Sequence, residues 1–267
     1  MKLLLKTVGV LGILFLLCSC ATTPRREPFT FVQLCDPQLG MGGYEHDVEV
    51  FTKAVAKINE LQPDFVAICG DLVQDANDQS FADFKRIRDG LEVPCHTVSG
   101  NHDVGRHPDP GSLKRYRDVI GEDYYSFEHK GYTFVVVNTQ LWKSPVPGET
   151  EKQDVWLEQT LSSAAGKGSP VFILCHYPLF LESPDEPDEY MNLPMAKRGE
   201  LLRLYERSGV VAVVGGHAHR FIENDCRGIQ LVNGESTSKN FDKRPMGFRV
   251  WHIEGTRPFR HEFIAVD

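Results

Sequence analysis

The stretch Phe65-Val66-Ala67-Ile68-Cys69-Gly70-Asp71-Leu72 decides the fold of this 267-residue chain. Its five apolar residues are too few for a helix and rich in strand formers, which predicts a strand buried on both faces. Gly70 then permits a tight turn, and Asp71 stands at the carboxyl end of the strand. In α/β sheets that end borders the ligand crevice, where a carboxylate needs a compensating charge. The stretch therefore predicts an α/β sheet with a charged ligand site at its edge.

Four further apolar runs end in the same way, with polar residues directly after a predicted strand. The runs and the residues that follow them are 30–35 with Asp36 and Gln38, 94–99 with Asn101 and His102, 171–175 with His176, and 210–214 with His217 and His219. Carboxylate, amide and imidazole groups are the usual ligands of divalent metal ions. The sequence therefore predicts a metal centre at the strand ends, and we expect Asp71 to bridge two ions.

Composition limits the possible functions. The formal charge of −8 argues against broad nucleic-acid binding, which needs a basic face. Five of the seven cysteines lie beyond residue 20, and an odd number at irregular spacing is not a disulfide framework. Three of them, Cys35, Cys69 and Cys175, lie beside proposed ligands; we interpret them as buried packing residues, with soft metal ligands as the alternative.

The first twenty residues differ from the rest of the chain. Lys2 and Lys6 precede an uncharged apolar run over 8–17, which is typical of a secretory signal and too short to span a bilayer. The following Leu17-Cys18-Ser19-Cys20 resembles a bacterial lipoprotein box, in which a small residue precedes the lipidated cysteine. We therefore expect a signal peptide over 1–19, lipid on Cys20, a tether over 20–28 and one domain over 29–267. A plain cleaved signal or an uncleaved anchor is the alternative.

Periodicity outlines the remaining elements. Apolar residues at helical spacing predict helices over 47–61, 81–91, 114–120, 152–164 and 197–208. Alternating runs predict a hairpin from 124–128 and 132–138, and three strands over 229–233, 247–253 and 259–266. Strands that alternate with helices in the first half are typical of a largely parallel sheet. The segment 178–194 is a long acidic loop, and its part 182–189 is expected to be a solvated lid.

Five short motifs, taken in order, resemble those of the calcineurin-like metallophosphoesterases. They are Asp36-Pro37-Gln38, Gly70-Asp71, Gly100-Asn101-His102-Asp103, His176 and Gly216-His217-Ala218-His219, with residues 124–127 and 176–183 adding similarity to one subgroup. The resemblance covers nearly all of the mature chain. It implies a four-layer αββα sandwich of two mixed β-sheets flanked by helices, with the metal site at the carboxyl ends of the strands.

The resemblance also implies a role for each motif residue. The first metal would be held by Asp36, Gln38, Asp71 and His219, and the second by Asp71, Asn101, His176 and His217. In such a two-metal site a bridging water attacks phosphorus, and the ions, roughly 3.5–4 Å apart, clamp the attacking and leaving oxygens. The expected ions are Mn, Fe or Zn. His102 would stabilise the transition state or protonate the leaving oxygen.

Two positions depart from the family pattern. Gln38 stands where most members have histidine, and its neutral oxygen favours manganese or magnesium at the first site, unless Gln38 only holds a metal-bound water. Gln74 stands where the usual aspartate partner of His102 is found, so we expect Asp75 or Asp103 to orient His102 instead. Neither departure removes the predicted metal site.

The leading hypothesis is a metal-dependent enzyme that hydrolyses phosphomonoesters, with phosphoserine and phosphothreonine among the candidates. Arg106, Arg220 and Lys239 are the candidate phosphate contacts. The alternatives are a phosphodiesterase or nucleotide phosphatase for phosphate scavenging, and a non-catalytic phosphate-binding surface lipoprotein. We expect a lipid-anchored protein of the bacterial cell envelope, with Ala21 favouring the outer membrane, and no nucleic-acid partner beyond a nucleotide substrate.

Overall fold

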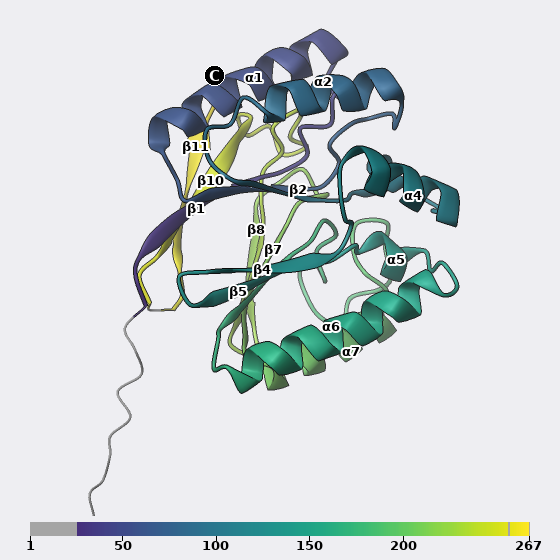
Figure 1. The fold of residues 1–267 in the computed structure, drawn as a ribbon, viewed down its shortest axis with the longest axis vertical. Coiled ribbons are helices and arrows are strands. Elements are labelled where there is room, and N and C mark those ends of the chain that lie inside the picture. Colours follow the sequence, from purple (N-terminus) through teal and green to yellow (C-terminus); the bar gives the residue numbers. More distant parts are fainter. Residues whose placement is uncertain (1–25, 256, 267) are drawn as a thin grey trace, which may run out of the picture.

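Two mixed β-sheets pack face to face and are covered by helices on both outer sides (Figure 1). The structure is a computed structural model that describes residues 26–255 and 257–266. The predicted signal peptide, Cys20 and the first part of the tether lie outside these residues. The predicted four-layer architecture is confirmed, and Figure 1 shows its layers from α1 and α2 at the top to α6 and α7 at the bottom.

The first sheet carries three of the predicted ligand-bearing strands. Its order is β11-β10-β1-β2-β3, and β1, β2 and β3 run parallel. The antiparallel strand β10 pairs with β1 on the other side, so β1 and β2 are central. The bounds are β1 (Phe29–Leu34), β2 (Phe65–Cys69), β3 (Cys95–Val98), β10 (Gly247–Ile253) and β11 (Arg260–Ala265).

The second sheet carries the other two ligand-bearing strands. Its order is β4-β5-β6-β7-β9-β8, with β5, β6, β7 and β9 parallel. The predicted hairpin is present as β4 and β5, whereas β8 was not predicted because its sequence Ile-Glu-Asn-Asp-Cys is mostly polar. The bounds are β4 (Tyr125–His129), β5 (Tyr132–Val136), β6 (Val171–Leu174), β7 (Val210–Gly215), β8 (Ile222–Cys226) and β9 (Ile229–Asn233).

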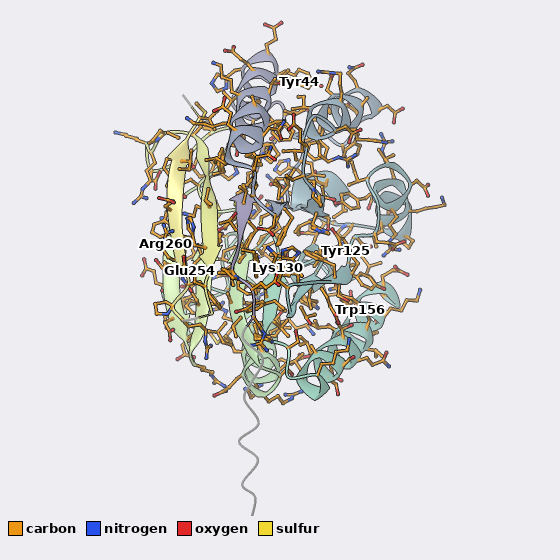
Figure 2. All side chains as sticks on the ribbon, turned by 60° about the vertical axis from the view of Figure 1, so that its left-hand side comes forward. Tyr44, Tyr125, Lys130, Trp156, Glu254 and Arg260 are labelled. Carbon is orange, nitrogen blue, oxygen red and sulfur yellow. The ribbon has the colours of Figure 1, made fainter. Side chains whose placement is uncertain are left out.

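Helices cover the outer face of each sheet. In Figure 2, Tyr44 of α1 and Trp156 of α6 lie on opposite outer sides of the molecule. The five predicted helices are present, but several begin earlier than expected; α2, for example, starts at Asp78 because Asn77 caps it through the N–H of Ser80. No helix in the described part is long and apolar enough to cross a membrane. The bounds are α1 (Tyr44–Leu61), α2 (Asp78–Arg88), α3 (Asn101–Val104), α4 (Pro110–Val119), α5 (Gln140–Lys143), α6 (Glu149–Gly166) and α7 (Met195–Arg207).

Aromatic side chains fill the space between the two sheets. Phe31 of β1 stacks on Trp251 of β10 at a ring distance of 5.5 Å. Phe65 of β2 meets the edge of Phe134 from the other sheet at 4.9 Å. Such contacts across the seam add to the free energy gained by burial and fix the sheets relative to each other. The carboxyl ends of strands from both sheets are therefore held beside one another.

Candidate metal centre

All seven predicted metal ligands meet where strands of the two sheets end. The first sheet contributes Asp36 and Gln38 after β1, Asp71 after β2 and Asn101 after β3, and the second contributes His176 after β6 with His217 and His219 after β7. Each of these side chains is buried, with no more than 4% of its surface exposed. Polar groups buried this deeply need partners, which makes a shared cation a natural explanation.

The ligand atoms form two groups that share Asp71. Asp71, His176 and His217 make one group, Asp36, Asp71 and His219 make the other, and the atoms within each group lie within 4.8 Å of one another. His176 Nε2 is 3.3 Å from the Asp71 carboxylate and 3.3 Å from the Asn101 side-chain oxygen. This arrangement places Asp71 between two cation positions.

The backbone is unusual at these residues. Asp36, Gln38, Asp71, His217 and His219 have φ angles of 48°, 33°, 47°, 71° and 49°, a left-handed region that non-glycine residues rarely adopt. Residues in such conformations cluster at functional sites because the surrounding structure must hold them there. The carboxylates help, since Asp36 accepts the His217 N–H at 3.0 Å and Asp71 accepts the His102 N–H at 2.9 Å.

Two glycines allow the ligand loops to approach one another. A Cβ atom on Gly70 would lie 2.4 Å from Nδ1 of His176, and one on Gly100 would lie 2.2 Å from the backbone nitrogen of Asp71. Gly70 also has a φ angle of 84°. Any larger residue at either position would push the strand ends apart.

Each histidine of the site is oriented by a backbone carbonyl. Nδ1 of His176 lies 2.9 Å from Cys69 O, Nδ1 of His219 lies 2.6 Å from Lys239 O, and Nε2 of His217 lies 3.4 Å from Tyr190 O. An N–H that donates to a carbonyl leaves the other ring nitrogen free to bind a metal. In all three rings that other nitrogen faces the carboxylates or a neighbouring ligand histidine.

The charges of the centre are strongly coupled. Burial raises the pKa of Asp36 to about 6, although His219 and His176 partly offset the effect. Burial acts against ionisation of Asp71 too, but His176 outweighs it and lowers the pKa of that carboxyl. The same pairing raises the pKa of His176 to about 10 in spite of its burial. Cations that bind here must therefore compete with protons.

The amide of Gln38 fits a cation site. Its nitrogen donates to the side-chain oxygen of Gln74 at 3.0 Å, which fixes which end of the amide is the oxygen. That oxygen, Oε1, is buried and has no hydrogen-bond partner among the described residues. A buried acceptor without a donor calls for an ion or a water. Together with the carboxylates and imidazoles, it makes a donor set suited to two divalent ions.

The partner of His102 is not one of the two predicted carboxylates. Asp103 accepts the N–H groups of Leu72 and Gly100 at 2.8 and 2.7 Å, and Asp75 is exposed. Nδ1 of His102 lies instead 2.8 Å from the carbonyl oxygen of Gln74. The orienting group is thus part of the backbone, and sequence reasoning has no signal for it.

A cleft of about 190 Å³ opens over the ligands. Of the three predicted phosphate-binding cations only Arg106 lines it; Arg220 and Lys239 are exposed, and Lys239 contributes its carbonyl to His219. Sequence reasoning missed Tyr190 and Phe241, which lie in loops without periodicity. The lining residues are Gln38, Met41, Asp71, Gln74, His102, Arg106, Tyr190, Met191, His217, His219 and Phe241.

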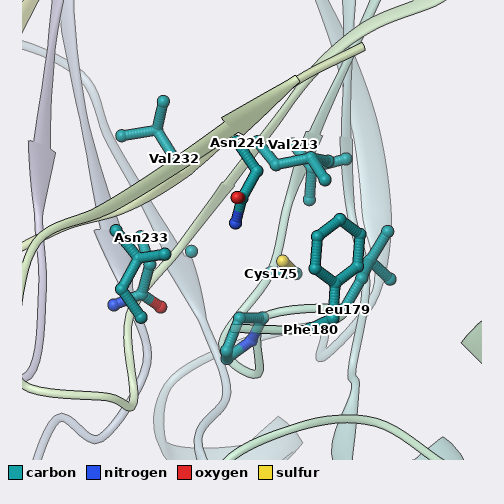
Figure 3. A pocket seen from close by; sticks show the side chains of 11 residues that line it. Cys175, Leu179, Phe180, Val213, Asn224, Val232 and Asn233 are labelled. Atoms are coloured by element: carbon teal, nitrogen blue, oxygen red, sulfur yellow. The ribbon is translucent and has the colours of Figure 1, made fainter. Parts of the chain in front are cut away.

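A separate small cavity contains none of the ligands. Leu179 and Phe180 lie over one side of it, with Cys175, Val213 and two asparagines around it (Figure 3). Cys35, Cys69 and Cys175 are buried free thiols, and neither group of candidate metal-binding residues in the described part includes a cysteine. This agrees with their interpretation as packing residues.

Comparison with known proteins finds phosphoesterases and phosphatases. Residues 29–221 match the family described as calcineurin-like phosphoesterase. A relative from Danio rerio, serine/threonine-protein phosphatase CPPED1, is 37% identical over 248 residues, covering 84% of this chain and 80% of its own length. The probable cyclic nucleotide phosphodiesterase syc0937_d from Synechococcus is 26% identical, covering 88% and 89%.

The fold has solved counterparts as well. The crystal structure of a dimetal phosphatase from Danio rerio superposes with a TM-score of 0.67 at 18% identity, covering 90% of this chain and 96% of its own. Residues 36–38, 124–127 and 176–183 indicate the subgroup of calcineurin-like phosphoesterase domain-containing protein 1, and the similarity to the relative named CPPED1 supports it.

Proposed function

This chain belongs to the calcineurin-like phosphoesterase family and is a dimetal hydrolase of phosphoric esters, and on that premise we propose that it acts on phosphomonoesters. Phosphoserine and phosphothreonine are the first substrates to examine, because the relative at 37% identity is named as a serine/threonine-protein phosphatase. The observation that supports the proposal most directly is the pair of ligand groups sharing Asp71 at the floor of an open cleft.

The proposed roles of the residues follow from their positions. Asp36, Gln38, Asp71 and His219 would hold one ion, and Asp71, Asn101, His176 and His217 the other. Two bound divalent ions supply a nucleophile from water and neutralise charge on the phosphoryl group. His102, whose Nδ1 is held by the Gln74 carbonyl, would present Nε2 to the leaving oxygen. Arg106 would contact the phosphate from the side of the cleft.

Turnover of an aryl phosphate by the purified protein with manganese tests the proposal. We expect hydrolysis in the wild-type protein and none in an Asp71→Asn variant, since that change weakens the ligand common to both ions. If the wild-type protein binds phosphate but hydrolyses no ester with manganese, iron, zinc or magnesium, it acts as a non-catalytic phosphate-binding protein.

A diesterase is the second candidate. The relative from Synechococcus is named as a probable cyclic nucleotide phosphodiesterase, and it aligns with 88% of this chain. A panel that pairs an aryl phosphate with the corresponding bis-aryl phosphate, and a nucleoside monophosphate with the cyclic form, separates the two activities. A kcat/KM for diesters above that for monoesters would favour the diesterase.

The proposed location is the bacterial cell envelope, with a lipid on Cys20 and Ala21 favouring the outer membrane. Its support is the sequence Leu17-Cys18-Ser19-Cys20 after an apolar run. An enzyme in that place lacks an ATP-driven kinase beside it, so small phosphoesters join phosphoproteins as candidate substrates.

A further inference from the structure

The segment 178–194, whose acidic part 182–189 is largely exposed as expected, is tied to the protein by hydrogen bonds. Arg198 of α7, which is fully buried, donates to the carbonyl oxygens of Ser183, Pro184 and Glu186 through one guanidinium nitrogen and to Leu193 through the other two. An arginine that donates to several carbonyls at once joins the middle of the segment to its end. The loop therefore has a defined path between β6 and α7.

Further contacts hold the same loop from inside and from its base. The Glu186 carboxylate accepts the N–H groups of Leu181, Glu182 and Ser183 and the amide of Asn192. Lys143 of α5 donates to the carbonyls of Glu189 and Asn192. Leu179 and Phe180 anchor the start of the loop beside the small cavity of Figure 3, each with 4% of its surface exposed. These contacts fix the position of Tyr190, which lies on this loop, at the wall of the cleft.

Tyr190 contacts two of the residues proposed to hold the second ion. Its carbonyl oxygen is 3.4 Å from Nε2 of His217, and its hydroxyl oxygen accepts from the side-chain nitrogen of Asn101 at 3.3 Å. The first contact leaves Nδ1 of His217 facing Nε2 of His176 at 3.2 Å. The second directs the amide nitrogen of Asn101 away from the ion position and its oxygen toward His176. One residue therefore orients two ligands.

The hydroxyl group of Tyr190 can also donate a hydrogen bond. A phenol that accepts a hydrogen bond from Asn101 still has its own proton to donate, and the side chain lies in the wall of the cleft with 43% of its surface exposed. The Arg106 guanidinium lies over the ring, 5.1 Å from its centroid. A phosphate oxygen above the second ion position would meet both donors.

We propose that Tyr190 is a positioning residue for the second metal ion and, through its hydroxyl group, a substrate-binding residue that donates a hydrogen bond to a phosphate oxygen. The proposal rests on the proposed function as a dimetal phosphoesterase. It assigns the phosphate contacts of the cleft to a pair, Tyr190 and Arg106, whose side chains also support each other.

The test uses Tyr190→Phe, which keeps the ring and its stacking on Arg106 and removes only the hydroxyl group. Titration of the metal-free protein with Mn²⁺ should show the ion of the second site, the one held with Asn101 and His217, binding about 10-fold more weakly, the low end of the effect known for groups that orient metal ligands. With Mn²⁺ saturating, inorganic phosphate should bind about 10-fold more weakly, as expected for one lost hydrogen bond. KM should rise more than kcat falls.

Two further variants separate the effect of the Tyr190 hydroxyl group from effects of its ring and of the loop. Tyr190→Ala also removes the surface on which Arg106 stacks, so phosphate binding should fall further than in Tyr190→Phe. Glu189→Ala changes an exposed neighbour on the same loop and should keep the wild-type affinities. Thermal unfolding of each variant checks that the fold is intact.

The outcomes separate this inference from the proposed function. Wild-type affinity of Tyr190→Phe for both the second Mn²⁺ and phosphate would overturn the inference. If the wild-type protein hydrolyses no ester but Tyr190→Phe still weakens both binding steps, the inference stands and the proposed function fails.

Discussion

Gln38 is the one amide among the four proposed ligands of the first ion. Its unpartnered oxygen would complete a first site of two carboxylates, one amide and one imidazole, and oxygen-rich sites favour manganese or magnesium. We therefore expect higher activity with manganese than with zinc. Gln38→His should bind the first ion more tightly and shift the preference toward zinc or iron. To compare the two proteins, the metals are removed from both, each metal is titrated back, and occupancy and turnover are measured together. If both proteins show the same order of metal preference and the same affinity at the first site, Gln38 lies outside the coordination sphere.

His102 should matter for turnover without holding a metal. Its ring is bound to the Gln74 carbonyl, and only its backbone N–H contacts Asp71. We expect His102→Ala to keep both ions and to lose turnover by about 10²–10⁴-fold, the range of general acid catalysis. Elemental analysis and kcat on the same sample measure the two effects.

A matched control for His102 is available nearby. His107 is exposed and its ring lies 3.3 Å from the Ser144 hydroxyl group, so His107→Ala should leave kcat close to that of the wild type. Loss of an ion from His102→Ala would mean that the ring is a ligand after all.

At the scale of elements, α7 holds the loop that borders the cleft. Arg198→Met should leave the carbonyls of Ser183, Pro184, Glu186 and Leu193 without their donor, and we expect a loss of at least about 2 kcal/mol in the free energy of unfolding. Limited proteolysis should also cut within 178–194. Arg207→Met, on the exposed side of the same helix, is the control. Equal stability and equal proteolysis of the two variants would show that Arg198 does not fix the loop.

His96 of strand β3 should make the stability of the folded protein depend on pH. The ring of His96 stacks on Phe127 of the other sheet at 3.5 Å, and burial lowers its pKa from 6.5 to about 4. Below pH 6.5 the unfolded chain binds a proton at this position that the folded chain takes up only near pH 4, so stability should decrease as pH falls across this range. His96→Leu should show a shallower decrease in thermal unfolding experiments; an identical slope would assign the acid sensitivity to other groups.

Elements marked by apolar runs or ligand residues could be predicted from the sequence, and elements without such patterns could not. Apolar runs that end in a ligand predicted five strands and brought seven ligand positions to one edge, because burial and chemistry are both visible in residue types. Strand β8 and the start of α2 were missed, since one is a polar edge strand and the other begins at a cap. Tyr190 and the Gln74 carbonyl were missed because a loop has no period and every residue has a carbonyl.

On the scale of the whole molecule, the described chain begins at the end opposite the cleft. The guanidinium of Arg26 donates to the carbonyls of Gly131 and Gly168, beside the amino end of β1, whereas the ligands follow its carboxyl end. The six residues of β1 separate the two by about 20 Å. A lipid on Cys20 would therefore hold the protein by the end away from its cleft.

Cys20→Ser tests the proposed anchor. Cells that express the variant and are fed a labelled fatty acid should yield an uncleaved or soluble protein without label, whereas the wild-type protein should carry label in the membrane fraction. Phosphatase activity per bound metal should be the same in both, because the cleft is remote from the anchor. Label on the variant would contradict lipidation at Cys20.

The carbonyls that orient the site histidines have a consequence for metal affinity. The rings of His176, His219 and His217 are held by Cys69, Lys239 and Tyr190, and the ligand loops by hydrogen bonds to Asp36 and Asp71, all of them contacts within the chain itself. The polypeptide itself therefore sets the orientation of these rings and loops. A substitution that removes one of these carbonyl contacts could then weaken metal binding even though every ligand residue is kept, so the metal affinity of the protein would depend on more positions than its ligands.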